Sequence, residues 1–404
     1  MAFDGFGKTQ TRMRYSSFII YIITTKSELT RNMNKAIVIG SDHHNTLGVI
    51  RGLGERGIKP DLVLIAPAAM TFVDASKYIA QKWRIDTDDE IVDLLISKYN
   101  NEKEKPVILC CSDSSSGVVD ENADLLRPYF YLPGAKGHGR ISKLMNKHEM
   151  ADLAVEVGLK IPLTIYLSET EQDLSSIKLP CIIKPIVSRK GSKTEIAICR
   201  TLKELEEYSK THNLFKDQIQ QFIDKDFEYQ LIGCSTSKEV IIPGLSKILR
   251  PCKGSNTSFL HYTPLEDGFC EIEKCKEFVR RTGYHGLFSL EFLRDKNGQD
   301  YFMEINFRND GNAICVTAAG VSLPYIWYLD CVGKEYTEEA NKEITPVYVM
   351  PDMAELKLLV TRQISLKDYI SDLRKTNRFM EYDKRDKKPF WKLIKYHLCS
   401  ILSI

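Results

Sequence analysis

The chain lacks the patterns that mark several classes of protein. Its 404 residues contain no run of 18 apolar residues, so no transmembrane helix is expected. The 11 cysteines form no C-x-x-C pair, and they scatter through apolar segments such as "PVILCCSD". This pattern predicts reduced, buried thiols in a cytoplasmic protein and argues against a zinc site. A net charge of only +2 argues against a dedicated nucleic-acid-binding protein.

Residues 1–32 are expected to form a weakly structured extension. Their apolar run lies in "SSFIIYIITT", has no small-residue cleavage pattern and is followed by the polar "KSELTRN". These features do not predict a signal peptide. Met33 begins "MNKAIVIGSD", which looks like a natural chain start. Whether residues 1–32 belong to the functional unit therefore stays open.

Residues 33–140 are predicted to form an α/β domain. "KAIVIGSD", "DLVLIAP" and "PVILCCSD" are apolar runs that end in small or polar residues, and helical patterns lie between them. Alternating buried strands and helices are typical of a doubly wound parallel sheet. No G-x-G-x-x-G motif follows the first strand, so a dinucleotide site is not supported.

Residues 141–345 are predicted to form a second domain of the α+β class. A helical pattern over residues 141–164 ends at Gly158, and short strand patterns such as "CIIKPI", "DQIQQFI" and "EYQLIGC" follow. Their close succession indicates antiparallel sheets. Residues 346–404 are expected to form a basic and aromatic C-terminal tail.

The segment "YFMEINFRNDGN" carries a pattern that points to a metal ion. Glu304, Asn306 and Arg308 alternate along a predicted strand and so share one face. If the two-residue turn of the hairpin, within "DKNG", centres on Asn297 and Gly298, Glu291 on the partner strand is predicted to lie nearly opposite Glu304. Two facing carboxylates repel each other, and Mg²⁺ would resolve this because it prefers oxygen ligands. The alternative is a solvated hairpin whose charges have no function.

Basic residues suggest a phosphate site. Lys184 lies inside the apolar run "PCIIKPI", where an unpaired ammonium is costly. The loop "VSRKGSKTE" follows it, and its backbone amides and hydroxyl groups could cradle phosphates. The loop residues considered for this role are Ser188, Lys190, Gly191, Ser192 and Lys193. Basic turns are common on protein surfaces, so the loop alone is a weak signal, and Lys147 alone reads as a surface lysine.

Together these segments, in this order, resemble the ATP-grasp superfamily of ATP-dependent ligases over roughly residues 33–335. The resemblance is carried by "NKHEMADLAVEVGLKIP", "CIIKP", "IQQFIDKDFEYQ" and "EFLRDKNGQDYFMEINFR". It implies an α/β N-terminal parallel-sheet domain followed by an α+β ATP-grasp domain with antiparallel sheets.

The resemblance also implies roles for individual residues. Residues implied to bind ATP are Lys147, Lys184, the lid residues Ser188, Lys190, Gly191, Ser192 and Lys193, the hinge residues Gln221, Phe222 and Ile223, and the ribose ligand Glu228. Residues implied to bind Mg²⁺, or Mn²⁺ in its place, are Glu291, Glu304 and Asn306. Arg308 is the implied catalytic residue. Gln221 stands where the family more often has Glu, but the hinge reads adenine through its main chain.

The implied activity is ligation of a small-molecule carboxylate to an amine through an acylphosphate. Residues 304–334 are similar to the branch that includes D-aspartate ligases of cell-envelope gene clusters, and the resemblance also allows an oligomer. The alternative is a carboxylase-type or carbamoyl-phosphate-type enzyme that phosphorylates bicarbonate. A biotinyl carrier, a glutaminase or a second ATP-grasp half would accompany that activity, and none is visible in these residues.

The predicted tail has two interpretations. The segment from Asp372 to His397 contains nine Lys or Arg residues and four acidic residues, a net charge of +5 (9 − 4). Aromatic and aliphatic residues are interleaved in "KKPFWKLIKYHLCSILSI". Such a segment can lie on an anionic membrane surface, which predicts peripheral membrane contact through residues 384–404 at the cytoplasmic face. A helix docked on the catalytic body, with a solvated basic face, is the commoner alternative.

Overall fold

The computed structural model describes residues 34–68, 70–135, 139–166, 174, 177–185, 197–212, 214, 217–251, 258–266, 268, 269 and 271–402 of the 404-residue chain. The predicted extension and the predicted lid at residues 188–193 lie outside the described residues. The side chains of residues 147, 185, 251, 258 and 400–402 are likewise outside the description.

The N-terminal part is a four-stranded parallel sheet with the order β3-β2-β1-β4. Its strands are β1 (Ala36–Ser41), β2 (Asp61–Ile65), β3 (Lys82–Ile85) and β4 (Val107–Cys110). Both faces of β1 are buried, with Ile37 and Ile39 in one apolar cluster and Val38 in another. Burial on both faces explains the continuous apolar runs and confirms the predicted sheet. The sequence reading missed β3, an edge strand in which Lys82 and Arg84 are exposed.

Helices connect these strands or follow the last of them. They are α2 (His44–Gly54), α3 (Ile91–Tyr99), α4 (Asp113–Glu121) and α5 (Ala123–Leu126), with the short 3-10 helices η1 (Val73–Ala75) and η2 (Asp88–Glu90). The helix predicted from residue 141 is two helices, α6 (Arg140–Leu144) and α7 (Lys147–Glu156). Asn146 separates them, because its side chain accepts a hydrogen bond from the amide of His148 and caps α7.

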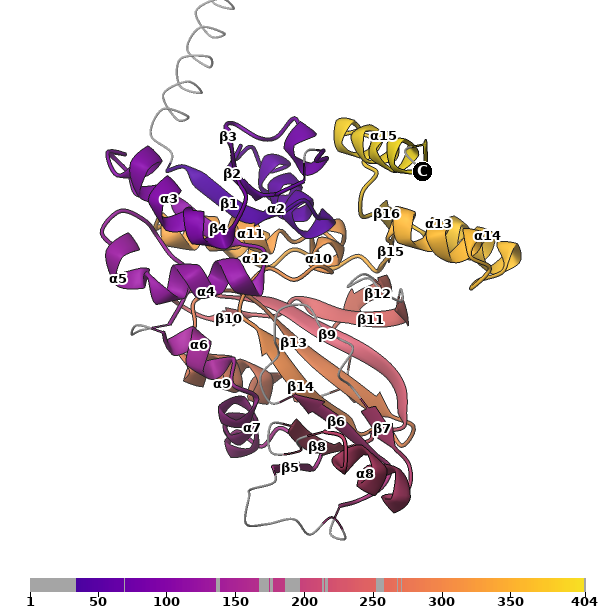
Figure 1. Cartoon of the computed structure of the whole chain (residues 1–404). Coiled ribbons are helices and arrows are strands. Elements are labelled where there is room, and N and C mark those ends of the chain that lie inside the picture. Colours follow the sequence, from indigo (N-terminus) through magenta and orange to yellow (C-terminus); the bar gives the residue numbers. More distant parts are fainter. Residues whose placement is uncertain are drawn as a thin grey trace, which may run out of the picture.

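Two further sheets confirm the predicted α+β part (Figure 1). The smaller has the antiparallel order β5-β8-β6-β7, formed by β5 (Thr164–Tyr166), β6 (Cys181–Pro185), β7 (Ala197–Cys199) and β8 (Asp217–Gln221). The larger has the order β14-β13-β9-β11-β12-β15-β16, with β10 paired to β9. Its strands are β9 (Lys225–Ser235), β10 (Val240–Ile241), β11 (Gly244–Pro251), β12 (Ser258–Pro264), β13 (Gly286–Asp295), β14 (Asp300–Asn306), β15 (Val347–Met350) and β16 (Arg378–Phe379).

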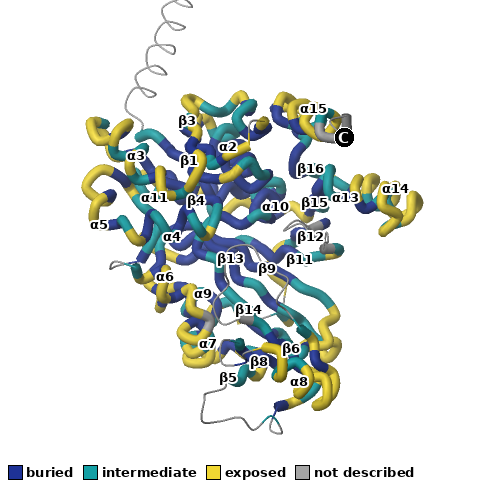
Figure 2. Tube along the Cα trace, in the orientation of Figure 1, coloured by how far each residue is buried: buried dark blue, intermediate teal, exposed yellow. Residues whose placement is uncertain are grey.

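The remaining helices lie beside the smaller sheet, beside the larger sheet and in the C-terminal part. They are α8 (Leu202–Ser209), α9 (Ile272–Thr282), α10 (Ile314–Ala318), α11 (Leu323–Cys331), α12 (Thr337–Ala340), α13 (Asp352–Val360), α14 (Leu366–Lys375) and α15 (Lys388–Leu402). Buried residues run through the parallel sheet and into the larger sheet, whereas most of α14 is exposed (Figure 2). Helix α11 packs against both α2 and β9, so it joins the N-terminal part to the larger sheet.

The C-terminal segment is integrated into the fold rather than a tail. Strand β15 pairs with β12 and with β16, so the predicted boundary at residue 345 cuts through one sheet. On α15, Leu393 is buried and Lys392 forms an ion pair with Asp74. This is the arrangement that the docked-helix alternative predicts, although Trp391 and Leu398 remain exposed on the same helix. Among the described residues, no helix has the length and apolar character needed to cross a membrane.

Candidate active site

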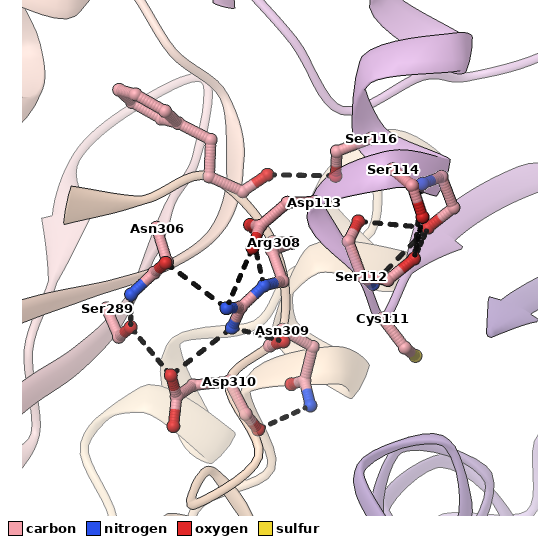
Figure 3. Close-up of polar contacts among 12 residues, drawn as sticks. Cys111, Ser112, Asp113, Ser114, Ser116, Ser289, Asn306, Arg308, Asn309 and Asp310 are labelled. Atoms are coloured by element: carbon pink, nitrogen blue, oxygen red, sulfur yellow. Dashed lines mark hydrogen bonds and ion pairs between the residues drawn. The ribbon is translucent and has the colours of Figure 1, made fainter. Parts of the chain in front are cut away.

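The hairpin of β13 and β14 brings four predicted residues to one place. Glu291 lies directly opposite Glu304 in the register of the two strands. The side-chain amide of Asn306 donates to the Glu291 carboxylate at 3.1 Å. The side-chain oxygen of Asn306 accepts from Arg308 at 3.1 Å (Figure 3). The convergence predicted from the alternation of residues along the strand is therefore present in the structure.

A β-bulge sets this register. The amide of Asp295 donates to the carbonyl of Gln299, which leaves the three residues 296–298 in the turn rather than two. A three-residue turn without a bulge would pair Glu291 with Met303. The register shifts by one residue at this point of the hairpin, so that Glu291 pairs with Glu304 instead. Bulges of this kind often re-aim a side chain beside an active site.

Neither of the facing carboxylates forms an ion pair with another described residue. Burial, the charge of Glu304 and the charge of Asp310 raise the pKa of Glu291 to about 8, against lowering contributions from Gln230 and Arg308. The side chain of Glu304 makes no hydrogen bond or ion pair with any other described residue. A divalent cation between the two carboxylates would favour their ionised forms.

The donor set fits Mg²⁺ with ligands added by a substrate. No group of three or more Asp, Glu, His or Cys side chains suited to a metal occurs among the described residues. Two carboxylates and the Asn306 amide are too few to enclose the ion. Mg²⁺ typically keeps water and substrate phosphates in its remaining positions. The pair thus suits a metal that arrives with a nucleotide.

A buried network that was not predicted from the sequence supports the hairpin. The Asp310 carboxylate accepts hydrogen bonds from the Ser289 hydroxyl at 3.0 Å and from the backbone amide of Asn312 at 2.8 Å. The Asn312 side chain donates to Gln230, which in turn donates to Glu291. Asp310 and Asn312 directly follow the predicted strand, so the polar run "RNDGN" was the available signal. Nothing in the local sequence marks Gln230 or Ser289.

The parallel sheet meets this hairpin at the carboxyl ends of β1 and β4. The backbone amide of Asn309 donates to the carbonyl of Cys110. The side chain of Asn45 donates to the carbonyls of Cys111 and Asn309. Arg308 forms an ion pair at 2.9 Å with Asp113, the first residue of α4. Strand order reverses between β1 and β4, and ligands of open α/β sheets bind at such a switch point.

The predicted nucleotide residues lie beside the smaller sheet. Lys184, on β6, donates to the Gln220 side chain at 2.9 Å. A small cavity is lined by Lys184 together with Met150 of α7 and Met303 of β14. Lys147 is the first residue of α7, but its side chain lies outside the description. The cavity therefore lies between the smaller sheet and β14, the strand that carries Glu304.

The predicted hinge connects the two antiparallel sheets. Gln221 ends β8, and β9 begins at Lys225. The backbone amide of Gln221 donates to the carbonyl of Leu163, and the backbone amide of Phe222 donates to the carbonyl of Pro180. The Ile223 amide makes no hydrogen bond with another described residue, so it is a free backbone donor there. Glu228, the predicted ribose ligand, lies on β9 and forms an ion pair with Lys225.

In the absence of divalent cations, the protein is expected to lose stability as the pH rises from about 5 to about 8. Glu291 has a folded-state pKa of about 8 against an ordinary value of 4.5, so between these values the folded state binds more protons than the unfolded state. By linkage, the free energy of unfolding falls as pH rises through this range. Glu291→Gln removes this titration, so its melting temperature should fall less with pH.

Thermal melting in EDTA across this pH range checks the expectation. At the upper end the variant should melt above the wild type, and added Mg²⁺ should stabilise only the wild type. Parallel pH profiles for the two proteins would contradict the assignment of Glu291.

Comparisons with solved structures show the ATP-grasp fold, as the sequence predicted. An L-amino acid ligase from Bacillus licheniformis is 16% identical, with 78% of each chain covered and a TM-score of 0.59. An ADP complex of N5-carboxyaminoimidazole ribonucleotide synthetase is 14% identical, with 82% of this chain and 86% of that chain covered and a TM-score of 0.62. The biotin carboxylase domain of a Hydrogenobacter thermophilus 2-oxoglutarate carboxylase, with MgADP and bicarbonate, is 17% identical over 75% and 71% of the chains, with a TM-score of 0.56.

Curated proteins give a shorter match. A formate-dependent phosphoribosylglycinamide formyltransferase from a Nitratiruptor species is 25% identical in a match of 199 residues, and the match covers 45% of this chain and 48% of the relative. The corresponding protein from Wolinella succinogenes is 26% identical in a match of 190 residues, and the match covers 44% of this chain and 47% of the relative. The chain thus spans about half the length of the curated relatives it matches. No family model matches it.

Proposed function

We propose that the chain is an ATP-dependent ligase that joins a carboxylate to an amine through an acylphosphate. The observation that carries the proposal is the facing pair Glu291 and Glu304, with Asn306 and Arg308 on the same face. This donor set suits a magnesium–nucleotide complex better than a metal held by protein alone. The names of the structural neighbours, among them a ligase and complexes with ADP, support ATP and Mg²⁺ as the cofactors.

Each residue set has one task in this proposal. Lys184 binds phosphate oxygens as a positive charge, and the amide of Ile223 donates to the adenine edge. Glu291, Glu304 and Asn306 hold Mg²⁺, which neutralises phosphate charge when bound. The carboxylate substrate attacks the γ-phosphorus, and ADP leaves. Catalysis of phosphoryl transfer rests mainly on positioning and charge stabilisation.

The second step uses the same site. The amine attacks the carbonyl carbon of the acylphosphate, inorganic phosphate leaves with the electrons of the C–O bond, and the phosphate takes up the proton that the amine loses. Arg308 stabilises negative charge on the phosphoryl group or on the tetrahedral intermediate. Water must be excluded, because it would hydrolyse the acylphosphate. The predicted lid at residues 188–193 is assigned this task from the resemblance alone.

Phosphorylation of bicarbonate is the second candidate. The bicarbonate bound to one structural neighbour and the carboxylated product named for another favour it. Formate in the name of the curated relatives is a further one-carbon carboxylate and supports the same candidate.

The cell-envelope role is supported by the resemblance of residues 304–334. Membrane contact is supported by the exposed Trp391 and Leu398, and it is confined to the outer face of α15 because Leu393 is buried.

Phosphate release from ATP discriminates the candidates. With Mg²⁺ and pooled D- and L-amino acids, a carboxylate–amine ligase should release phosphate several-fold faster than with ATP alone, and the mass spectrum should contain a condensation product. Stimulation by bicarbonate without amino acids would favour the second candidate. Nucleotide binding without release under either condition would contradict both.

A further inference from the structure

Every N–H group of Arg308 is already donated to the protein. Its Nε and one Nη2 hydrogen bind Asp113 at 2.9 and 3.3 Å (Figure 3). The other Nη2 contact is to Asn306 at 3.1 Å, and Nη1 reaches Asp310 and the carbonyl of Asn309, both at 3.3 Å. A guanidinium has five N–H donors, and these are five contacts. Arg308 can bind a substrate only after one of these partners leaves.

The two carboxylates that hold Arg308 differ in how easily they could leave. The Asp310 side chain is only 7% exposed and is also held by Ser289 and Asn312. The Asp113 side chain is 48% exposed, and Arg308 is its only hydrogen-bond partner among the described residues. Asp113 also lies in the first turn of α4, where the helix dipole favours a carboxylate that has turned to water. Asp113 is therefore the removable partner.

We propose that Asp113 is a displaceable counterion that occupies the substrate's anion position on Arg308. Its two oxygens bind Nε and Nη2 as a fork, which is the geometry a substrate carboxylate or a phosphoryl group would adopt. An incoming anion with two oxygen acceptors takes this place, and Asp113 turns to solvent. Because Asp113 is supplied by the N-terminal domain, the exchange would also release one of the links between the hairpin and α4. This inference rests on the proposed function for the identity of the anion.

Displacement of Asp113 from Arg308 costs the free energy of their ion pair, and this cost discriminates between substrates. A neutral substrate cannot replace the charge of Asp113, so Arg308 would stay paired and the site closed to it. A singly charged carboxylate restores the pairing, and a phosphoryl group exceeds it. Asp113 thus acts as a specificity-determining residue against uncharged ligands.

The test uses anion binding, which needs no turnover. Thermal melting of the full chain is titrated with inorganic phosphate and, separately, with acetate at low ionic strength. Asp113→Asn keeps the size of the side chain but removes its charge. Its half-saturating anion concentration should be about fivefold lower than in the wild type, a change of about 1 kcal/mol, as expected for removing a half-exposed competing ion pair. A lower value for phosphate than for acetate would identify a phosphoryl group as the occupant, and the reverse a carboxylate.

Two controls separate this effect from a structural one. Glu102→Gln removes another partly exposed ion pair of the same domain, that with Lys35, and should leave anion binding unchanged. The double variant Asp113→Asn/Arg308→Gln should lose the gain. If Asp113→Asn binds both anions no more tightly than the wild type, if neither protein binds them, or if the double variant keeps the gain, the inference is overturned. Failure of every protein to consume ATP would instead contradict the proposed function, since the titration does not depend on it.

Discussion

Replacement of Glu304 by Gln is expected to lower the rate of ATP-dependent phosphate release at least tenfold, a barrier increase of about 1.4 kcal/mol or more. Glu304 is partly exposed, faces Glu291 and makes no other polar contact with a described residue. Its charge is therefore not needed for packing, and in the proposal it serves to hold Mg²⁺ on the phosphates. Gln has the same size but is a weaker ligand.

The fold of this variant should be unaffected. Removing one of two facing like charges should leave the melting temperature in EDTA equal to that of the wild type or slightly higher. The stabilisation by Mg²⁺ should be lost together with phosphate release. Glu102→Gln, at an ion pair of the N-terminal domain, is the matched control for a lost carboxylate. If Glu304→Gln keeps more than about a tenth of the wild-type rate, the metal assignment is wrong.

Replacement of Arg51 by Met is expected to lower the free energy of unfolding by about 3–5 kcal/mol. Arg51 and Asp386 form an ion pair at 3.2 Å in which each side chain is 1% exposed. Arg51 also donates to the carbonyls of Met380 and Glu381, and Asp386 accepts from Ser76. Removal of the guanidinium leaves a buried carboxylate without its charge partner, and this accounts for most of the expected loss.

A second variant separates the ion pair from general damage. Arg51→Met/Asp386→Asn removes both charges, so it should recover part of the stability that Arg51→Met loses, as found when both partners of a buried pair become neutral. Urea unfolding of the three proteins measures this. A loss below about 1 kcal/mol for Arg51→Met, in the range of exposed pairs, would contradict the view that residues 346–402 are part of the folded body.

The sequence predicts the parts of the site that depend on local pattern. Residues that alternate along one strand share a face, so Glu304, Asn306 and Arg308 could be grouped from their spacing alone. The pairing of Glu291 with Glu304 was also predicted, but through a two-residue turn. The structure reaches the same pairing with a longer turn and a bulge, two deviations that compensate each other in the register.

The rest of the site depends on contacts between segments that are distant in the chain. Asp113 and Arg308 are 195 residues apart, and no local pattern connects them. Gln230 meets Glu291 only because β9 and β13 are neighbours in the larger sheet. The contacts that hold the C-terminal segment could not be predicted for the same reason: the partner of Asp386 is Arg51, near the other end of the chain. From charge and composition alone, this segment had two interpretations, a segment on a membrane surface and a helix docked on the catalytic body.

The formation of an acylphosphate is the central claim, and oxygen transfer tests it most directly. The full chain is incubated with Mg²⁺, unlabelled ATP and amino acids whose carboxylate oxygens are ¹⁸O, and the released phosphate is analysed by mass. Attack of the carboxylate on the γ-phosphorus predicts that each phosphate released with product carries one ¹⁸O atom, since the C–O bond of the acylphosphate breaks when the amine attacks. Product formation with unlabelled phosphate would show that the carboxylate oxygen never bonded to phosphorus, and would contradict the account.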